Sequence, residues 1–169
     1  RFDIQKLENL NSHYIRNMDE GELCELLIDE ISAGIGRDLS QVEKVRLPLA
    51  INALKERSQT LVELADKAGF LLDARPLAME KEAAKSITDD VPELLAKAHA
   101  CLSALTDWNK DVLSAALRGL AETEGMKLGK LAQPLRAALT GRNASPGIFE
   151  VLYFLGRQES LDRISDHMK

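Results

Sequence analysis

The sequence predicts an all-α, two-lobed helical bundle without a sheet, and three observations carry that prediction. Ala, Leu, Glu and Lys dominate the 169 residues, and these residue types favour helices. Apolar side chains recur at helical spacing, as Leu128, Leu131, Leu135 and Leu139 do. No run alternates apolar and polar residues with period 2, and no Asn-Gly pair marks a hairpin.

The N-terminal half is expected to hold four helices. Asp3 is placed to cap a first helix that runs to Arg16. Three later helices begin at pairs typical of capping boxes, in which a short polar side chain precedes a Glu by three positions: Asp19 and Glu22, Ser40 and Glu43, Thr60 and Glu63. The second helix is expected to end at Gly34 and Gly36. The third contains Pro48, which predicts a kink, and its expected apolar stripe is Val42, Val45, Leu49 and Leu54.

A break over residues 68–76, which contains Gly69, Asp73 and Pro76, is expected to separate two helical lobes. Helices are then expected over residues 79–86, 88–105, 108–124 and 127–140. Trp108, the only indole, is expected to anchor a helix start in the core. Gly141 suits the position just past a helix end, and Ser145-Pro146 suits an N-cap and first helical residue.

Composition excludes several classes of function. The sequence has no stretch of about 18 uncharged apolar residues, so it predicts no membrane span, and no secretory signal is visible. Cys24 and Cys101 are isolated, and the three histidines have no partners at metal-ligand or catalytic spacing, so neither a catalytic nor a metal site is expected. The net charge of −5 argues against a general nucleic-acid binder, but residues 126–169 carry seven Lys/Arg against four Asp/Glu.

Three segments carry a resemblance to a known family: AQPLRAALTG, SPGIFEVLYFLGRQESLDRI and KLENLNSHYIR. They resemble the anticodon-binding portion of bacterial glutamyl-tRNA synthetases, which are class I ligases that attach glutamate to tRNA(Glu) with ATP. The chain has no HIGH-like motif, no KMSKS-like loop and no βαβ pattern. Together with a first residue that is Arg rather than Met, this predicts a fragment without the catalytic half. ATP and Mg²⁺ would belong to that half, and this chain itself is expected to need no cofactor.

The resemblance implies domains, partners and site residues. Residues 1–18 would end the tRNA stem-contact region, and residues 19–72 and 73–169 would be two anticodon-binding subdomains. The partner would be tRNA(Glu), with no DNA and no membrane, and the enzyme would be a cytoplasmic monomer. Lys6 would contact stem phosphates. The residues implied to contact the anticodon or tRNA are Arg57, Arg118, Leu128, Gln133, Arg136, Ser145, Pro146, Gly147 and Ile148.

Four of these residues have a purely structural alternative. Arg57 could satisfy carbonyl groups at a helix C-terminus, and Arg118 could form a surface ion pair with Glu122 four residues on. Ile148 could belong to the core, and Lys6 could be a solvated lysine. The whole chain could likewise be a helical protein-interaction module without RNA binding, or the anticodon module of another class I synthetase.

Overall fold

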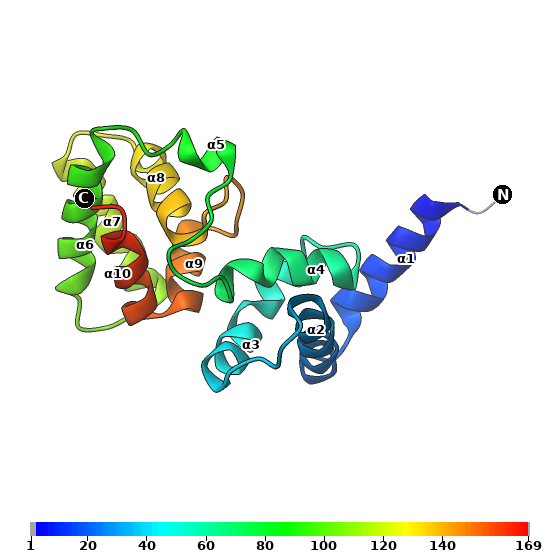
Figure 1. Cartoon of the computed structure of the whole chain (residues 1–169). Helices are drawn as coiled ribbons and strands as arrows, with labels where there is room; N and C mark the ends of the chain where they lie inside the picture. Colours follow the sequence, from blue (N-terminus) through cyan, green and yellow to red (C-terminus); the bar gives the residue numbers. More distant parts are fainter. Residues whose placement is uncertain (1–2, 169) are drawn as a thin grey trace. The chain divides into compact units, whose positions relative to one another are not determined.

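The computed structural model describes residues 3–168, which form helices and loops and contain no strand (Figure 1). The predicted all-α class is therefore confirmed. The chain divides into two compact units, Arg1–Leu72 and Asp73–Lys169. Each unit has its own core and is described separately below.

The first unit contains α1 (Ile4–Asn17), α2 (Glu20–Ile35), α3 (Gln41–Lys55) and α4 (Leu61–Ala68), followed by the short 3-10 helix η1 (Gly69–Leu71). Helices α2, α3 and α4 pack against one another, and η1 contacts α3 and α4. Their facing sides bury a leucine-rich core: Leu23, Leu27, Leu47, Ile51, Leu54 and Leu64.

The three predicted helix starts of this unit are confirmed at the atomic level. Asp19 accepts hydrogen bonds from the backbone N–H groups of the first turn of α2. Ser40 and Glu43 form a reciprocal capping box on α3, and the Thr60 hydroxyl accepts from the N–H of Glu63 at 3.1 Å. Gly36, with φ of 70°, ends α2 in the left-handed conformation that glycine adopts without steric cost. Local sequence signals thus set these boundaries.

The predicted apolar stripe of α3 is wrong. Val42, Val45 and Leu49 are exposed at 57, 68 and 45%, and only Leu54 of the expected set is buried. The helix instead buries the face that carries Leu47, Ala50, Ile51 and Leu54. Both faces of α3 are apolar, so periodicity alone could not select between them. Glu43 lies on the buried face, four residues before Leu47.

Glu43 is the main buried acid of the first unit, and its environment keeps it ionised. The Arg37 guanidinium binds its two carboxylate oxygens at 2.7 and 2.9 Å, and the N–H of Ser40 donates to it at 2.6 Å. The hydrogen bonds from Arg37, followed by those of Ser40, lower the pKa of Glu43 to about 2, against the opposing effect of partial burial. A carboxyl group whose pKa is lower in the folded state stabilises the fold above its unfolded pKa.

We expect Glu43→Gln to lower the stability of the first unit by about 1–2 kcal/mol at pH 7, since it replaces the charge-assisted pair with Arg37 by a neutral contact, while its amide oxygen can still accept from the N–H of Ser40. The difference from wild type should be largest above pH of about 4.5 and should shrink as the pH falls toward about 2. Thermal unfolding followed by circular dichroism across that range measures it. Glu25→Gln, an exposed change on α2, is the control, and an equal pH dependence in both variants would contradict the assignment.

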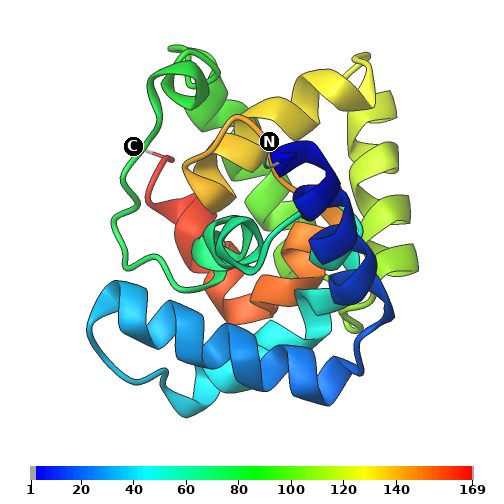
Figure 2. The same cartoon turned by 90° about the vertical axis from the view of Figure 1, so that its right-hand side faces the viewer.

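The second unit contains α5 (Lys81–Ala84), α6 (Val91–Ser103), α7 (Lys110–Thr123), α8 (Leu128–Thr140), α9 (Ile148–Leu155) and α10 (Arg157–Ser165). Figures 1 and 2 show it from two sides. The last helix, α10, packs against α6, α8 and α9, while α7 contacts α6, α8 and α9. The core is formed by the sides that face inward, including Leu95, Leu102, Leu117, Leu135, Leu152 and Phe154.

Trp108 anchors the start of α7 in this unit, as predicted. Its indole N–H donates to the carbonyl of Leu152 on α9 at 2.9 Å. The guanidinium of Arg157 lies over its ring, with the carbon at 5.6 Å from the ring centre. The indole is therefore engaged on its edge and on a face, which leaves it unsuited to act as an open stacking platform for a base.

Candidate nucleic-acid interface

The connection between α8 and α9 carries most of the residues implied to contact an anticodon. α8 ends at Gly141, whose φ of 66° is left-handed, as expected. α9 begins later than the Ser-Pro signal predicts: Gly147 is its N-cap, and Ser145 and Pro146 lie in the preceding loop. The cause is Glu150, whose carboxylate accepts from the N–H of Gly147 at 3.1 Å and so caps the helix from its third position.

Arg136 and Ser145 are brought together across this connection. The Nε–H of Arg136 donates to the hydroxyl oxygen of Ser145 at 2.9 Å, and that hydroxyl donates to the carbonyl of Pro146. Pro146 is buried, whereas Arg136 and Ser145 are half-buried. On α8, Gln133 lies about one turn before Arg136 and is exposed, and Leu128 opens the helix and is half-buried. The loop therefore presents polar atoms beside one face of α8.

Arg118 reaches the start of α9 from a different helix. Its Nε–H donates to the Ser114 hydroxyl at 3.1 Å, and its guanidinium lies 5.8 Å from the centre of the Phe149 ring. The structure therefore gives it Ser114 and Phe149 as partners rather than Glu122. Phe149 follows Ile148, which is buried at 5% exposure and belongs to the core. Phe149 is the residue that the sequence reasoning missed, because its contact with Arg118 joins positions 31 apart.

Arg57 lies in the first unit, directly after α3, and its side chain is exposed. The carbonyl groups at the end of α3 are satisfied by other residues. Arg16 donates to the carbonyl of Glu56 at 3.2 Å, the Ser58 hydroxyl donates to that of Leu54 at 2.8 Å, and the Lys67 ammonium donates to that of Arg57 itself. The guanidinium of Arg57 makes no hydrogen bond or ion pair within residues 3–168.

Lys6 lies in the first turn of α1 and is exposed. Its backbone N–H donates to the Asp3 carboxylate at 3.3 Å, so Asp3 caps the helix as predicted. The ammonium group has no partner among the described residues. It is therefore free to meet a phosphate as a mobile point charge.

The described part of the chain lacks the features of a metal site, a membrane span or a reactive thiol. Residues 3–168 contain no group of three or more His, Cys, Asp or Glu side chains that could hold a metal ion. None of the helices seen there combines the length and apolar character that crossing a membrane requires. Burial raises the pKa of both the Cys24 and the Cys101 thiols, and for Cys24 the neighbouring Glu25 adds to this. Neither thiol is activated.

Comparison with known proteins agrees with this arrangement. A family model described as "Anticodon binding domain" matches residues 22–168. The chain is 48% identical over its whole length to glutamate–tRNA ligase 2 of Rhodospirillum centenum and 47% identical over 99% of its length to glutamate–tRNA ligase 1 of Brucella melitensis. It spans only 36 and 37% of those two proteins, about a third of the length of the curated relatives.

The fold also matches solved structures. One is the crystal structure of a glutamate tRNA ligase from Elizabethkingia meningosepticum, with a TM-score of 0.83 at 21% identity, covering 99% of this chain and 32% of that one. At this identity the likeness shows the fold alone. The family model, by contrast, covers most of the sequence, and the chain belongs to the anticodon binding domain family.

Proposed function

We propose that this chain is the anticodon-recognition part of a glutamate–tRNA ligase and that its partner is tRNA(Glu). The parent enzyme would attach glutamate to that tRNA with ATP and Mg²⁺ at sites outside these 169 residues. The names of the relatives and the family support this reading. Residues 1–18 are proposed to border the tRNA stem, and residues 19–72 and 73–169 to be two anticodon-binding subdomains of a cytoplasmic monomer that needs neither DNA nor a membrane.

The observation that carries the proposal is that two arginines from other helices contact the residues around the start of α9. Within positions 145–149, Arg136 from α8 meets Ser145 and Arg118 from α7 meets Phe149. Unpaired RNA bases are read on their Watson–Crick edges and stack on aromatic rings or guanidinium planes. Arg136 and Ser145 can supply the edge contacts, while Arg118 and Phe149 supply a surface for stacking. Pro146 and Ile148 would form the buried floor of such a pocket, and Gly147, Gln133 and Leu128 its border.

Arg57 is proposed as a second base-reading residue. In the structural alternative, Arg57 would donate hydrogen bonds to the carbonyl groups at the end of α3. Those carbonyl groups already accept from Arg16, Ser58 and Lys67. An exposed guanidinium that local structure does not need is available for a base. Its five donors and lack of any acceptor suit a base edge that presents acceptors.

Variants at Arg136 and Lys6 test the proposal, because base and phosphate contacts respond differently to a changed anticodon. We expect Arg136→Ala to weaken binding of tRNA(Glu) by about 1–2 kcal/mol. A base contact can contribute up to about 3 kcal/mol, but the Nε–H of Arg136 already donates to Ser145. It should affect a tRNA with an altered anticodon less. Lys6→Ala should weaken both tRNAs about equally, as loss of a phosphate contact would. Filter binding at fixed salt measures the six affinities of wild type and the two variants for the two tRNAs. Equal losses for both tRNAs in Arg136→Ala would show that Arg136 does not read a base.

One observation favours a second candidate function, a helical protein-interaction module. Val42, Val45 and Leu49 form an exposed apolar stripe on α3, and the net charge of the chain is −5. A protein partner could cover that stripe without any RNA. Salt dependence separates the two functions, because phosphate contacts make RNA affinity fall steeply as salt rises, whereas apolar burial does not.

A further inference from the structure

The segment that opens the second unit, residues 73–80, is joined to two separate parts of that unit. At its beginning it contacts α10, the last helix. At its end it contacts the loop between α8 and α9, which holds Ser145. Neither attachment involves a residue implied to touch tRNA.

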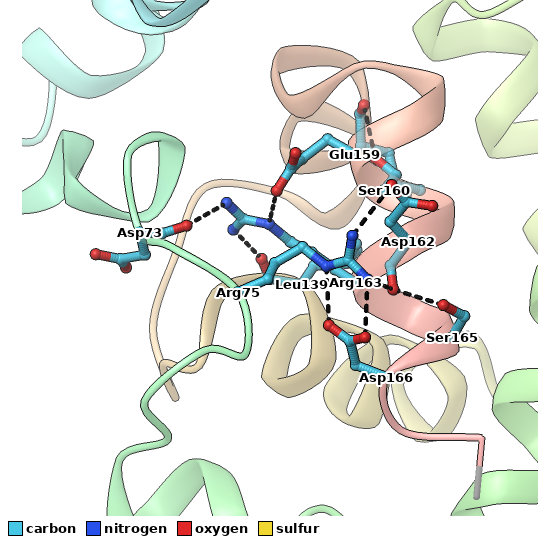
Figure 3. Close-up of polar contacts among 10 residues, drawn as sticks. Asp73, Arg75, Leu139, Glu159, Ser160, Asp162, Arg163, Ser165 and Asp166 are labelled. Atoms are coloured by element: carbon cyan, nitrogen blue, oxygen red, sulfur yellow. Dashed lines mark hydrogen bonds and ion pairs between the residues drawn. The ribbon is translucent and has the colours of Figure 1, made fainter. Parts of the chain in front are cut away.

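The first attachment is made by two arginines, shown in Figure 3. Arg163 is 1% exposed, and its two terminal nitrogens donate to the carbonyls of Leu139 at 2.7 Å and Asp73 at 3.1 Å. Its Nε–H donates to the Glu159 carboxylate at 2.7 Å. Leu139 lies in the last turn of α8, where carbonyl groups have no partner within the helix. One buried side chain therefore joins α10, the end of α8 and the start of the segment.

Arg75 adds a second bond between the segment and α10. It binds both oxygens of Asp166 at 2.8 and 2.9 Å and lies 3.1 Å from the Asp162 carboxylate (Figure 3). Its hydrogen bonds with Asp166 are the main cause that raises the pKa of its guanidinium. The beginning of the segment is thus held at Asp73 and at Arg75 to one helix.

The second attachment is made by Glu80. Its N–H donates to the carbonyl of Gly141 at 2.8 Å, and its carboxylate accepts from the N–H of Asn143 at 3.1 Å. The segment also passes so close to Gly141 that a Cβ there would overlap the carbonyl oxygen of Ala78. The loop that leads from Gly141 to Ser145 is therefore held from outside the α8–α9 pair.

We propose that residues 73–80 act as a positioning strap for the tRNA-contacting loop, residues 141–147. Arg163 holds the beginning of the strap, and Glu80 at its end holds the backbone of the loop. The inference rests on the proposed function. Binding sites lose affinity and selectivity when the residues that support them are loosened, even without contact with the ligand. Glu80 is a positioning residue in this sense, since it holds the backbone that presents Ser145 to Arg136.

Glu80 carries the test because it is exposed and its replacement should not unfold the chain. Glu80→Ala removes the bond to Asn143. Glu80→Gln keeps a carbonyl oxygen that can accept it, and is expected to restore wild-type behaviour. Glu82→Ala is the matched control, because it removes the same charge from the same helix region, and within residues 3–168 Glu82 pairs only with Lys85.

Two measurements on the full chain separate this inference from the proposed function. The first is the ratio of affinities for tRNA(Glu) and for the same tRNA with an altered anticodon. We expect Glu80→Ala to lower that ratio by about two- to tenfold, the range of one net hydrogen bond, and Glu82→Ala to leave it unchanged. The second is amide hydrogen exchange of residues 141–147, which should be faster in Glu80→Ala only.

The outcomes are distinguishable. If the wild-type chain shows no preference between the two tRNAs, the proposed function is wrong. The positioning role of residues 73–80 is then tested by the hydrogen exchange measurement alone. If the wild type does discriminate but Glu80→Ala and Glu82→Ala give equal ratios and equal exchange, the strap is overturned while the proposed function stands.

Discussion

Arg163→Met should lower the free energy of unfolding of the second unit by about 3–5 kcal/mol, the largest effect expected for any single change described above. Methionine can occupy much of the same volume, so the loss would come from polar groups rather than from a cavity. The buried carbonyl oxygen of Leu139 would lose the donor that Arg163 provides, and Asp73 and Glu159 would each lose their bond to Arg163. A buried acceptor left without a donor costs the full price of its desolvation.

The fluorescence of Trp108 measures this effect directly, since the chain's one tryptophan lies in the second unit. Urea unfolding followed at this residue therefore places the probe in the unit that contains Arg163. Arg75→Met is the matched control. It removes an arginine from the same cluster, but one that is a third exposed, and ion pairs near the surface contribute about 1 kcal/mol or less. If the two variants lose equal amounts of unfolding free energy, the burial of Arg163 does not explain its contribution to stability.

The second large effect concerns Arg57 and the third anticodon base. Glutamate anticodons end in C and glutamine anticodons end in G. Cytosine presents acceptors at N3 and O2 on its Watson–Crick edge, where guanine presents N1–H and N2–H donors. A guanidinium carries donors only, so it matches cytosine and sets donor against donor with guanine. Discrimination then comes from repulsion as well as attraction.

Arg57→Gln should therefore narrow the preference between two tRNAs that differ only at that base, by about 1–3 kcal/mol. Glutamine carries one donor group and one acceptor group, and can adapt to either base. The measurement is the ratio of binding constants of each tRNA for wild type and variant. Arg46→Gln, in the same unit on α3, is a control for the loss of one positive charge. If the ratio does not change in Arg57→Gln, Arg57 has no part in reading the base.

Features fixed by neighbouring residues could be predicted from the sequence. The capping pairs that start α2, α3 and α4 and the glycines that end α2 and α8 follow from local rules. Two local expectations failed. Glu150 caps α9 in place of Ser145, and α3 buries the other of its two apolar faces, which leaves Val42, Val45 and Leu49 exposed.

Contacts between distant positions could not be predicted. The sequence around Arg163 does not indicate that this arginine is buried. Its partners include the carbonyl groups of Leu139 and Asp73, which lie 24 and 90 positions away. The same holds for Phe149, whose contact with Arg118 depends on how α7 and α9 pack. The candidate site residues around Ser145 came from the family resemblance, and the structure adds the residues that support them, namely Glu80, Glu150 and Arg163.

The most direct test of the account is binding of the wild-type chain to a short anticodon stem-loop. One RNA carries the tRNA(Glu) anticodon loop, and a second has the same stem and loop length with the three anticodon bases changed. Anticodon recognition predicts tighter binding of the first RNA. Both affinities should fall as salt rises, because both RNAs share phosphate contacts. Equal affinity for the two RNAs, or binding of neither at low salt, would contradict anticodon recognition by this chain.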